Sequence, residues 1–196
     1  MFTGLIQEIA KVVSILPLGK GKALTVHLPI LGPAAKIGDS IALNGACLTA
    51  VGLDGPLVHF ELSPETLNKT NLNFLMEGTL LNAEPSLRLG DVLGGHLVQG
   101  HVDGLGELLT RTKEDSWEIF CISTPPEMKR LIAPKGSIAV NGVSLTVVES
   151  LNDRFTLALI PHTLGETTFG TMKPGAPVNL ESDMVARYVE RLMFYS

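Results

Sequence analysis

The sequence contains few aromatic residues, only two cysteines and no block of basic charge. Aromatic residues make up 5% of the 196 positions and hydrophobic residues 45%, so the core must be mainly aliphatic. Two cysteines in a chain of this length do not form the disulfide framework of a small secreted domain. Lys and Arg number 15 against 20 Asp and Glu, and without a basic patch no nucleic-acid partner is expected.

The signals of secretion and of membrane insertion are also missing. The first residues, MFTGLIQEIAK, have neither a basic start nor a long apolar stretch, which argues against a secretory signal. No apolar run approaches the roughly 18 residues that span a bilayer. We therefore expect a soluble, reduced protein of the cytoplasm with no membrane partner.

What the chain does contain is an internal repeat. Residues 43–51 read LNGACLTAV, and residues 140–148 read VNGVSLTVV. Residues 37–84 align with residues 134–181 without a gap, and identical residues recur along the whole stretch. A chance match does not keep one spacing for so long, so the halves are two copies of one fold.

Each copy reads as a series of short strands. Segments such as VHFEL at 58–62 and FTLAL at 155–159 are rich in β-forming residues and lie between turn residues. Strand after strand without a long helix predicts an all-β fold with a small antiparallel barrel in each half. We expect the domains to span residues 1–96 and 97–182.

The tail, residues 183–196, differs from both copies. The sequence DMVARYVERLMF places its apolar residues on one helical stripe, and Asp183 is a plausible cap. A terminal amphipathic helix has two plausible locations. It packs on its own chain, or it meets copies of itself at an oligomer axis.

Cys47 is the first candidate for chemistry. Alternation along a strand places Cys47 and Thr49 on one face. A free cysteine is usually a small buried hydrophobe, but this one lies in the repeated phrase, where its counterpart is the polar Ser144. The hydroxyl groups of Ser40 and its neighbours in both repeats either donate to a ligand or satisfy nearby backbone.

The segment GGHLVQGHVDG, residues 94–104, holds a second candidate. An odd spacing points His96 and His101 to opposite faces of a strand, and no cysteine cluster completes a site, so we expect no metal. The glycines suggest close backbone approach. A lone histidine is more often structural, but one in a glycine-rich pocket is a reasonable acid or base.

The third candidate is ETL at 65–67, repeated as HTL at 162–164. Each follows a strand and a proline, where a loop would close over a barrel mouth, and turn chemistry explains the motif as well as ligand binding does. Between equivalent positions of the two repeats, the chemically reactive residues differ, as Cys47 and Ser144 do, while the residues of the scaffold are the same. Two similar pockets with different reactive groups suit a reaction between two similar molecules, one donor and one acceptor.

Together, MFTGLIQE, NGACLT, GGHLVQGHVDG, NGVSLTV and IPHTL resemble the riboflavin synthase family of the alpha-chain type, a lumazine-binding repeat family. The resemblance covers the whole chain. It implies two tandem six-stranded antiparallel Greek-key barrels followed by a C-terminal helix. It also implies a homotrimer joined through these helices, with the active site between the first barrel of one subunit and the second barrel of its neighbour.

The implied reaction is a dismutation of two 6,7-dimethyl-8-ribityllumazine molecules, without metal or organic cofactor. One molecule gives up a four-carbon unit, and the products are riboflavin and 5-amino-6-(D-ribitylamino)uracil. A base must take a proton from the acidic C7 methyl of one substrate, and a nucleophile adds at C7 of the other. The sequence leaves open whether the protein associates with a lumazine synthase.

By motif, the resemblance assigns catalytic roles to four residues. His101 is the best base, Ser40 and Cys47 lie near the nucleophilic position, and water is an equal alternative as nucleophile. Asp183 matches a family acid, although a role at the helix terminus explains it equally well. The implied substrate contacts of the first barrel are Gly4, Leu5, Ile6, Cys47, Leu48, Thr49, Glu61, Leu62, Ser63, Pro64, Glu65 and Thr66. Those of the second barrel are Gly100, His101, Val102, Lys135, Ser144, Leu145, Thr146, Ala158, Leu159, Ile160, Pro161, His162 and Thr163.

Two other interpretations deserve comparison. A non-catalytic antenna protein of the same fold would bind a lumazine or flavin and turn nothing over. Such relatives lose polar residues from one pocket, whereas both NG-x-x-LT phrases are intact here. A flavin-dependent reductase domain would need a nucleotide-binding partner domain, and no G-x-G-x-x-G fingerprint follows any predicted strand.

Overall fold

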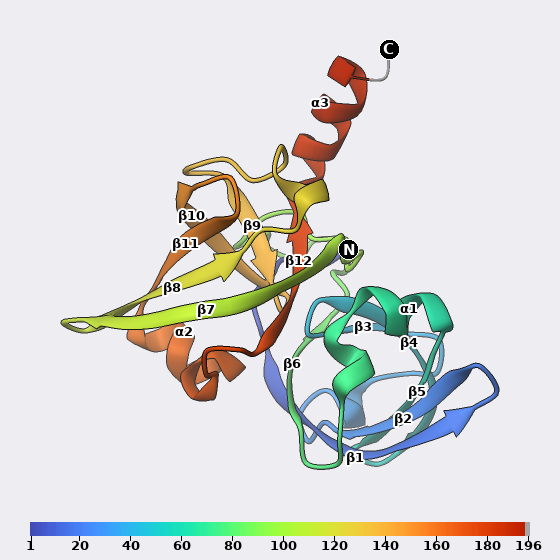
Figure 1. The fold of residues 1–196 in the computed structure, drawn as a ribbon. Helices are drawn as coiled ribbons and strands as arrows, with labels where there is room; N and C mark the ends of the chain where they lie inside the picture. The colour runs from blue at the N-terminus through green and yellow to red at the C-terminus, as the bar shows by residue number, and fades with distance from the viewer. Residues whose placement is uncertain (195–196) are drawn as a thin grey trace.

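The computed structural model describes residues 1–194 as two closed antiparallel barrels and a protruding helix (Figure 1). The first barrel consists of β1 (Glu8–Leu18), β2 (Gly21–His27), β3 (Ser40–Leu43), β4 (Ala46–Asp54), β5 (Leu57–Leu62) and β6 (Leu80–Pro85). The second consists of β7 (Gly104–Glu114), β8 (Trp117–Ser123), β9 (Ser137–Val140), β10 (Val143–Ser150), β11 (Arg154–Leu159) and β12 (Pro177–Ser182).

Both barrels have one topology. The strand order is β1-β2-β5-β4-β3-β6 in the first, and β10-β11-β8-β7-β12-β9 in the second is the same order around a closed ring. In each, three strands joined by hairpins are followed by a last strand that returns beside the first of the three, which is the Greek-key arrangement. The predicted fold class, all-β with a duplicated six-stranded barrel, is confirmed.

The repeated Asn-Gly pairs form the tight turns between β3 and β4 and between β9 and β10. Asn44 and Gly45 have φ of 45° and 78°, and Asn141 and Gly142 have the same values. Positive φ at both central residues is the type I′ hairpin turn that Asn-Gly favours. A Cβ added to Gly45 would lie 2.6 Å from Gly142 N, so the two turns touch and only glycine fits.

Buried asparagines join the barrels around these turns. Asn82 Nδ2 donates to Asn141 O over 2.9 Å, and Asn179 Nδ2 donates to Asn44 O over 2.8 Å. Each bond runs from the last strand of one barrel to the hairpin turn of the other. Because buried carbonyl groups need partners, these bonds fix the relative placement of the barrels.

Each barrel has its own core. Among the described core residues of the first barrel, Phe60 is the one aromatic, as the aliphatic composition predicts. The second core contains Phe120, Phe155 and Phe169, and the rings of Phe120 and Phe169 meet edge to face at 5.6 Å. The few aromatic residues are therefore concentrated in the second barrel.

Short helices lie where loops were expected after β5 and β11. They are α1 (Pro64–Lys69) and α2 (Pro161–Glu166). A 3-10 turn follows each helix: η2 (Asn71–Phe74) after α1 and η4 (Thr168–Thr171) after α2. Two further 3-10 turns, η1 (Gly32–Ala34) and η3 (Pro126–Met128), precede β3 and β9. Proline at the first helical position is pre-organised for a helix. Thr66 and Thr163 are therefore helical residues, a correction to the predicted loops.

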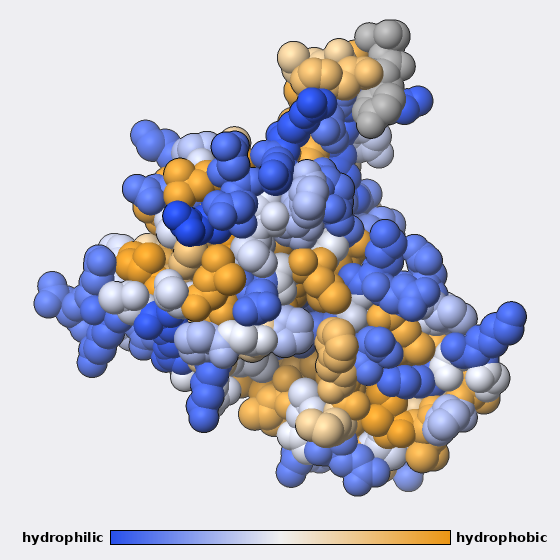
Figure 2. Space-filling view, in the orientation of Figure 1, coloured by the Kyte–Doolittle hydropathy of each residue, from blue (hydrophilic) through white to orange (hydrophobic). Residues whose placement is uncertain are grey.

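The tail forms α3 (Met184–Phe194), which projects from the second barrel (Figure 1). Asp183 caps it, since its Oδ1 accepts from Val185 N over 2.9 Å. Residues 195–196 of the predicted helix lie outside the described residues. No residue of α3 is buried in its own chain, and its apolar side chains remain exposed (Figure 2).

Candidate functional site

The segment before each barrel lies on the opposite barrel. We call residues 2–7, before β1, the first arm, and residues 98–103, before β7, the second arm. Ser144 N in β10 donates to Gly4 O over 2.8 Å, and Cys47 N in β4 donates to Gly100 O over 2.9 Å. The two arms pair with each other through Phe2 and Val98. The arms are therefore exchanged between the barrels.

Exchange of the arms corrects one prediction. Gly4–Ile6 was expected beside Cys47 in the first barrel, and Gly100–Val102 beside Ser144 in the second. In the structure Ile6 packs against the second core and Val102 against the first. Each pocket is therefore built from one repeat and the arm of the other.

Two buried glutamates anchor the arms to their own barrels. Glu84 in β6 accepts from Thr3 N over 2.6 Å and from Gly4 N over 3.0 Å. Glu181 in β12 accepts from Gln99 N over 2.7 Å and Gly100 N over 2.9 Å. Burial raises the pKa of both carboxyls, and the N–H groups of the arms oppose that rise. Each arm is thus held between a glutamate of its own barrel and a strand of the other.

Glycine is required where the arms cross. Gly4 and Gly100 have φ of 77° and 81°, a region that L side chains rarely adopt. A Cβ added to Gly100 would lie 2.6 Å from Cys47 Cβ, and one added to Gly4 would lie 2.5 Å from Ser144 Cβ. The predicted close backbone approach therefore occurs at these two positions.

His101 and Cys47 share a shallow cavity on the first barrel. Its volume is about 230 Å³, and its lining comes from β4, α1 and the second arm: Ala46, Cys47, Glu65, Thr66, Lys69, Thr70, Gly100, His101 and Val102. Leu48 points into the core while Cys47 is half-buried and Thr49 is exposed, as the strand alternation predicts. The cavity combines a thiol, an imidazole, an ammonium and hydroxyl groups at one surface.

The second barrel carries different chemistry at the equivalent place. Ser144 replaces Cys47, and the first arm brings Leu5 where the second arm brings His101. Ser144 Oγ lies 2.7 Å from Nδ1 of His96. Burial lowers the pKa of His96, and the nearby charge of Asp183 opposes this shift. The two histidines of GGHLVQGH therefore serve different barrels.

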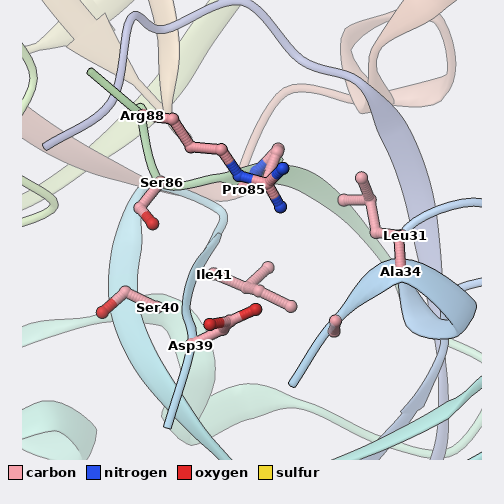
Figure 3. A pocket seen from close by; sticks show the side chains of 9 residues that line it. Leu31, Ala34, Asp39, Ser40, Ile41, Pro85, Ser86 and Arg88 are labelled. Atoms are coloured by element: carbon pink, nitrogen blue, oxygen red, sulfur yellow. The ribbon is translucent and has the colours of Figure 1, made fainter. Parts of the chain in front are cut away.

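Within one chain, Ser40 and Asp183 do not join His101 and Cys47. Ser40 lies at the edge of a cavity of about 240 Å³, into which Asp39 and Arg88 extend (Figure 3). Asp183 lines a cavity of about 350 Å³ beside α3, together with Ser137. Ser40 and Ser137 are equivalent in the repeat, so these cavities occupy matching places on the two barrels.

The other predicted contact residues divide by exposure. Leu48, Leu62 and Leu159 belong to the barrel cores, so only their backbone is available to a ligand. Lys135 has φ of 65°, where its repeat counterpart is Gly38. A lysine in this region carries backbone strain that the surroundings must offset, and such strain is common at functional sites.

Sequence reasoning missed three residues that shape the site. Glu84 and Glu181 anchor the arms, and their one signal was identity across the repeat. Arg187 of α3 was not among the predicted site residues, yet it contacts the second arm. Its partners in the second arm lie more than eighty positions earlier in the sequence, so no local pattern could reveal them.

In the described part of the chain, no group of three or more His, Cys, Asp or Glu side chains is placed to hold a metal ion. The helices within residues 1–194 are all too short or too polar to cross a membrane.

Known proteins with similar sequences and folds cover nearly the whole chain. The model of the lumazine binding domain family matches residues 3–86 and 99–183. The riboflavin synthase of Mycobacterium tuberculosis is 44% identical over 198 residues, which is 98% of each chain. That of Brucella abortus is 40% identical over 100% of this chain and 99% of its own. The crystal structure of LumP complexed with riboflavin has the same fold, with a TM-score of 0.87 at 24% identity over 93% of this chain and 99% of LumP.

Proposed function

Because the chain belongs to the riboflavin synthase family and contains the lumazine binding domain twice, we propose that it converts 6,7-dimethyl-8-ribityllumazine to riboflavin. In this dismutation one molecule passes a four-carbon unit to a second. The acceptor becomes riboflavin, and the donor is left as 5-amino-6-(D-ribitylamino)uracil. All atoms of the two substrates appear in the two products, so the reaction consumes no oxidant or reductant.

The observation that carries this proposal is that the two barrels have the same fold but present different side chains at equivalent surfaces. Equivalent surfaces of the barrels suit two copies of one flat substrate, which explains why the scaffold is duplicated. The first surface presents Cys47 and His101, whereas the second presents Ser144 and Leu5. Donor and acceptor roles require different reactive groups at two otherwise similar places. Holding two rings in register also supplies an orientation effect.

The proposal assigns roles to the side chains that line these cavities. His101 is exposed in the first-barrel cavity and is the proposed base for the C7 methyl proton. Cys47 lies beside it, so Cys47 or a water molecule next to it is the proposed nucleophile in this cavity. Ser40 and Asp183 line other cavities, and they reach a substrate only where a second copy of the chain completes the site.

Assembly into a homotrimer through α3 is part of the proposal. Its support is the apolar face of that helix, which its own chain leaves largely exposed: Val185, Tyr188, Val189, Leu192 and Met193. Domain limits at 1–96, 97–182 and 183–196 and a cytoplasmic location also remain predictions, and the sequence leaves association with a lumazine synthase open.

The test is to incubate the purified chain with 6,7-dimethyl-8-ribityllumazine in the presence of EDTA and to follow product by chromatography. We expect one riboflavin for each pair of lumazines consumed. Tight binding of the fluorescent substrate without riboflavin would contradict the proposal, and it would favour the antenna function that the sequence left open.

A further inference from the structure

The side chain of Arg187, on α3, contacts the second arm at three residues. Arg187 Nη2 donates to His101 O over 2.8 Å and to Asp103 Oδ2 over 2.9 Å, and Nη1 donates to Gln99 Oε1 over 3.1 Å. The guanidinium therefore contacts His101 and the residues two positions before and after it. A planar guanidinium is suited to this task because its donors lie in a rigid fork.

The same cation compensates the carboxylates where β12 continues into α3. Asp103 Oδ2 accepts from Ser182 N and Ser182 Oγ, each over 2.8 Å, in addition to Arg187. Glu181 is 3% exposed, and its Oε1 lies 3.9 Å from Arg187 Nη2. Buried carboxylates are stable only where cations or donors satisfy them. Loss of Arg187 would leave both groups short of a partner.

The first arm is held differently. Glu84 binds Thr3 and Gly4 as Glu181 binds the second arm, but the position equivalent to Asp103 is Gln7. The Gln7 side chain donates back to Leu5 O within its own arm. Arg187 lies in α3, beyond the end of the repeat, and no helix follows the first barrel at residues 86–103. The extra restraint is therefore specific to the arm that carries His101.

We propose that Arg187 is a positioning residue that fixes the second arm, keeps His101 in the first-barrel cavity and so makes that cavity depend on α3. The path is short, from Arg187 through His101 O and Gly100 O to Cys47 N. The His101 side chain is exposed, so the backbone supplies most of its placement. This inference rests on the proposed function only in that His101 transfers the substrate proton.

The first experiment measures the arm directly by amide hydrogen exchange, without substrate. Arg187→Gln should speed exchange in peptides covering the second arm by roughly tenfold or more and leave the first arm unchanged, because only one arm loses its restraint. Arg187→Lys keeps the positive charge but lacks the forked donors of the guanidinium, so its exchange rate in the second arm should lie between those of the wild type and Arg187→Gln. Arg154→Gln, which removes an arginine paired at 3.9 Å with the neighbouring Asp153, is the control and should change neither arm. Unchanged exchange in the second arm of Arg187→Gln would overturn the proposal.

The second experiment separates positioning from general stability by kinetics. Arg187→Gln should lower kcat by roughly 10- to 100-fold with little change in KM, the loss expected when a reacting group is misplaced. The double variant His101→Ala with Arg187→Gln should be no slower than His101→Ala alone, because Arg187 acts through His101. Multiplied losses in the double variant would show that Arg187 acts elsewhere and would overturn the proposal.

These measurements keep the two claims apart. If the wild-type chain forms no riboflavin, the proposed function fails, and hydrogen exchange alone then decides the role of Arg187. Sedimentation of Arg187→Gln should match that of the wild type. A variant that loses activity through altered assembly while its second arm stays protected would contradict the positioning role.

Discussion

Cys47 N in the first barrel donates a hydrogen bond of 2.9 Å to the carbonyl of Gly100, which enters from the second half of the chain. Ser144 and Gly4 repeat this bond with the halves reversed. The exchange places His101, encoded in the second repeat, beside the thiol of the first. A barrel cut from the chain would therefore lack part of its own pocket.

Gly100→Ala should displace the second arm from the first barrel. The new Cβ would lie 2.6 Å from Cys47 Cβ at a φ of 81°. Gly78→Ala is the matched control, because Gly78 has a φ of 84° with no atom within 4 Å of the added Cβ. Both variants should lose about 1–3 kcal/mol of stability from backbone strain, measured by urea unfolding. Only Gly100→Ala should also lose turnover; equal turnover in the two variants would contradict a role for the crossing.

His101→Ala should lower kcat by roughly 100-fold or more and change substrate affinity little, because proton transfer by a positioned base contributes about that much. Steady-state kinetics and fluorescence titration with the lumazine measure the two effects. His27→Ala, at the end of β2, is the control and should keep wild-type turnover. Comparable losses of kcat and affinity in His101→Ala would make His101 a binding residue instead.

Asn82→Ala should weaken the junction between the barrels. Asn82 is 0% exposed; its Nδ2 donates to Asn141 O and its Oδ1 accepts from Thr168 N over 2.8 Å. Two buried backbone groups would lose partners, at about 1–3 kcal/mol each. Urea unfolding measures the loss, and Asn152→Ala in an exposed turn should be nearly neutral. A cost for Asn82→Ala no larger than that of the control would contradict this account of the junction.

The stability of the protein should depend on pH through His96. Burial lowers its pKa below the ordinary 6.5, so between those values the unfolded chain binds a proton that the folded chain does not. The free energy of unfolding therefore falls as the pH drops through this window. Glu84 and Glu181 are unchanged in His96→Gln, so their contributions cancel in the comparison.

Urea unfolding of the wild type and His96→Gln between about pH 7.5 and pH 5 checks this dependence. The stability advantage of the wild type should shrink toward acid, by at most about 1.4 kcal/mol per pH unit for one proton. A difference that stays constant across this range would mean that His96 does not titrate as its burial requires.

Leu192→Glu should dissociate the proposed trimer without unfolding the barrels. The Leu192 side chain is 72% exposed on α3, so a charge there costs the isolated chain little but disrupts an apolar helix contact between copies. Analytical ultracentrifugation should then show monomers. Leu151→Glu, at an exposed position in the second barrel, should leave assembly unchanged. Trimers that persist in Leu192→Glu would remove α3 as the assembly element.

Much of the barrel fold was predictable from the sequence because it depends on short-range patterns of residues. The repeated phrases predicted two copies of one fold, and strand alternation predicted that Cys47 and Thr49 share a face; both are confirmed. The helices α1 and α2 were missed because six residues are too few to show a helical period.

The exchange of the arms could not be predicted, for a physical reason. Cys47 and Ser144 each offer a backbone N–H, and Gly4 and Gly100 each offer a carbonyl. Local chemistry is therefore the same for exchanged and unexchanged arms. Which barrel an arm binds depends on the distance it must cover once the buried asparagines have fixed the relative placement of the barrels. No short segment of the sequence specifies that distance.

The measurement that tests the central claim most directly uses an equal mixture of unlabelled lumazine and lumazine carrying ¹³C in C6, C7 and both attached methyl groups. Mass spectrometry then counts how many labelled four-carbon units each riboflavin contains. Transfer between two substrate molecules predicts riboflavin with none, one and two labelled units in the ratio expected for random pairing. Riboflavin that never contains two labelled units would show that the second unit comes from elsewhere, and it would contradict the account of two pockets acting on two copies of one substrate.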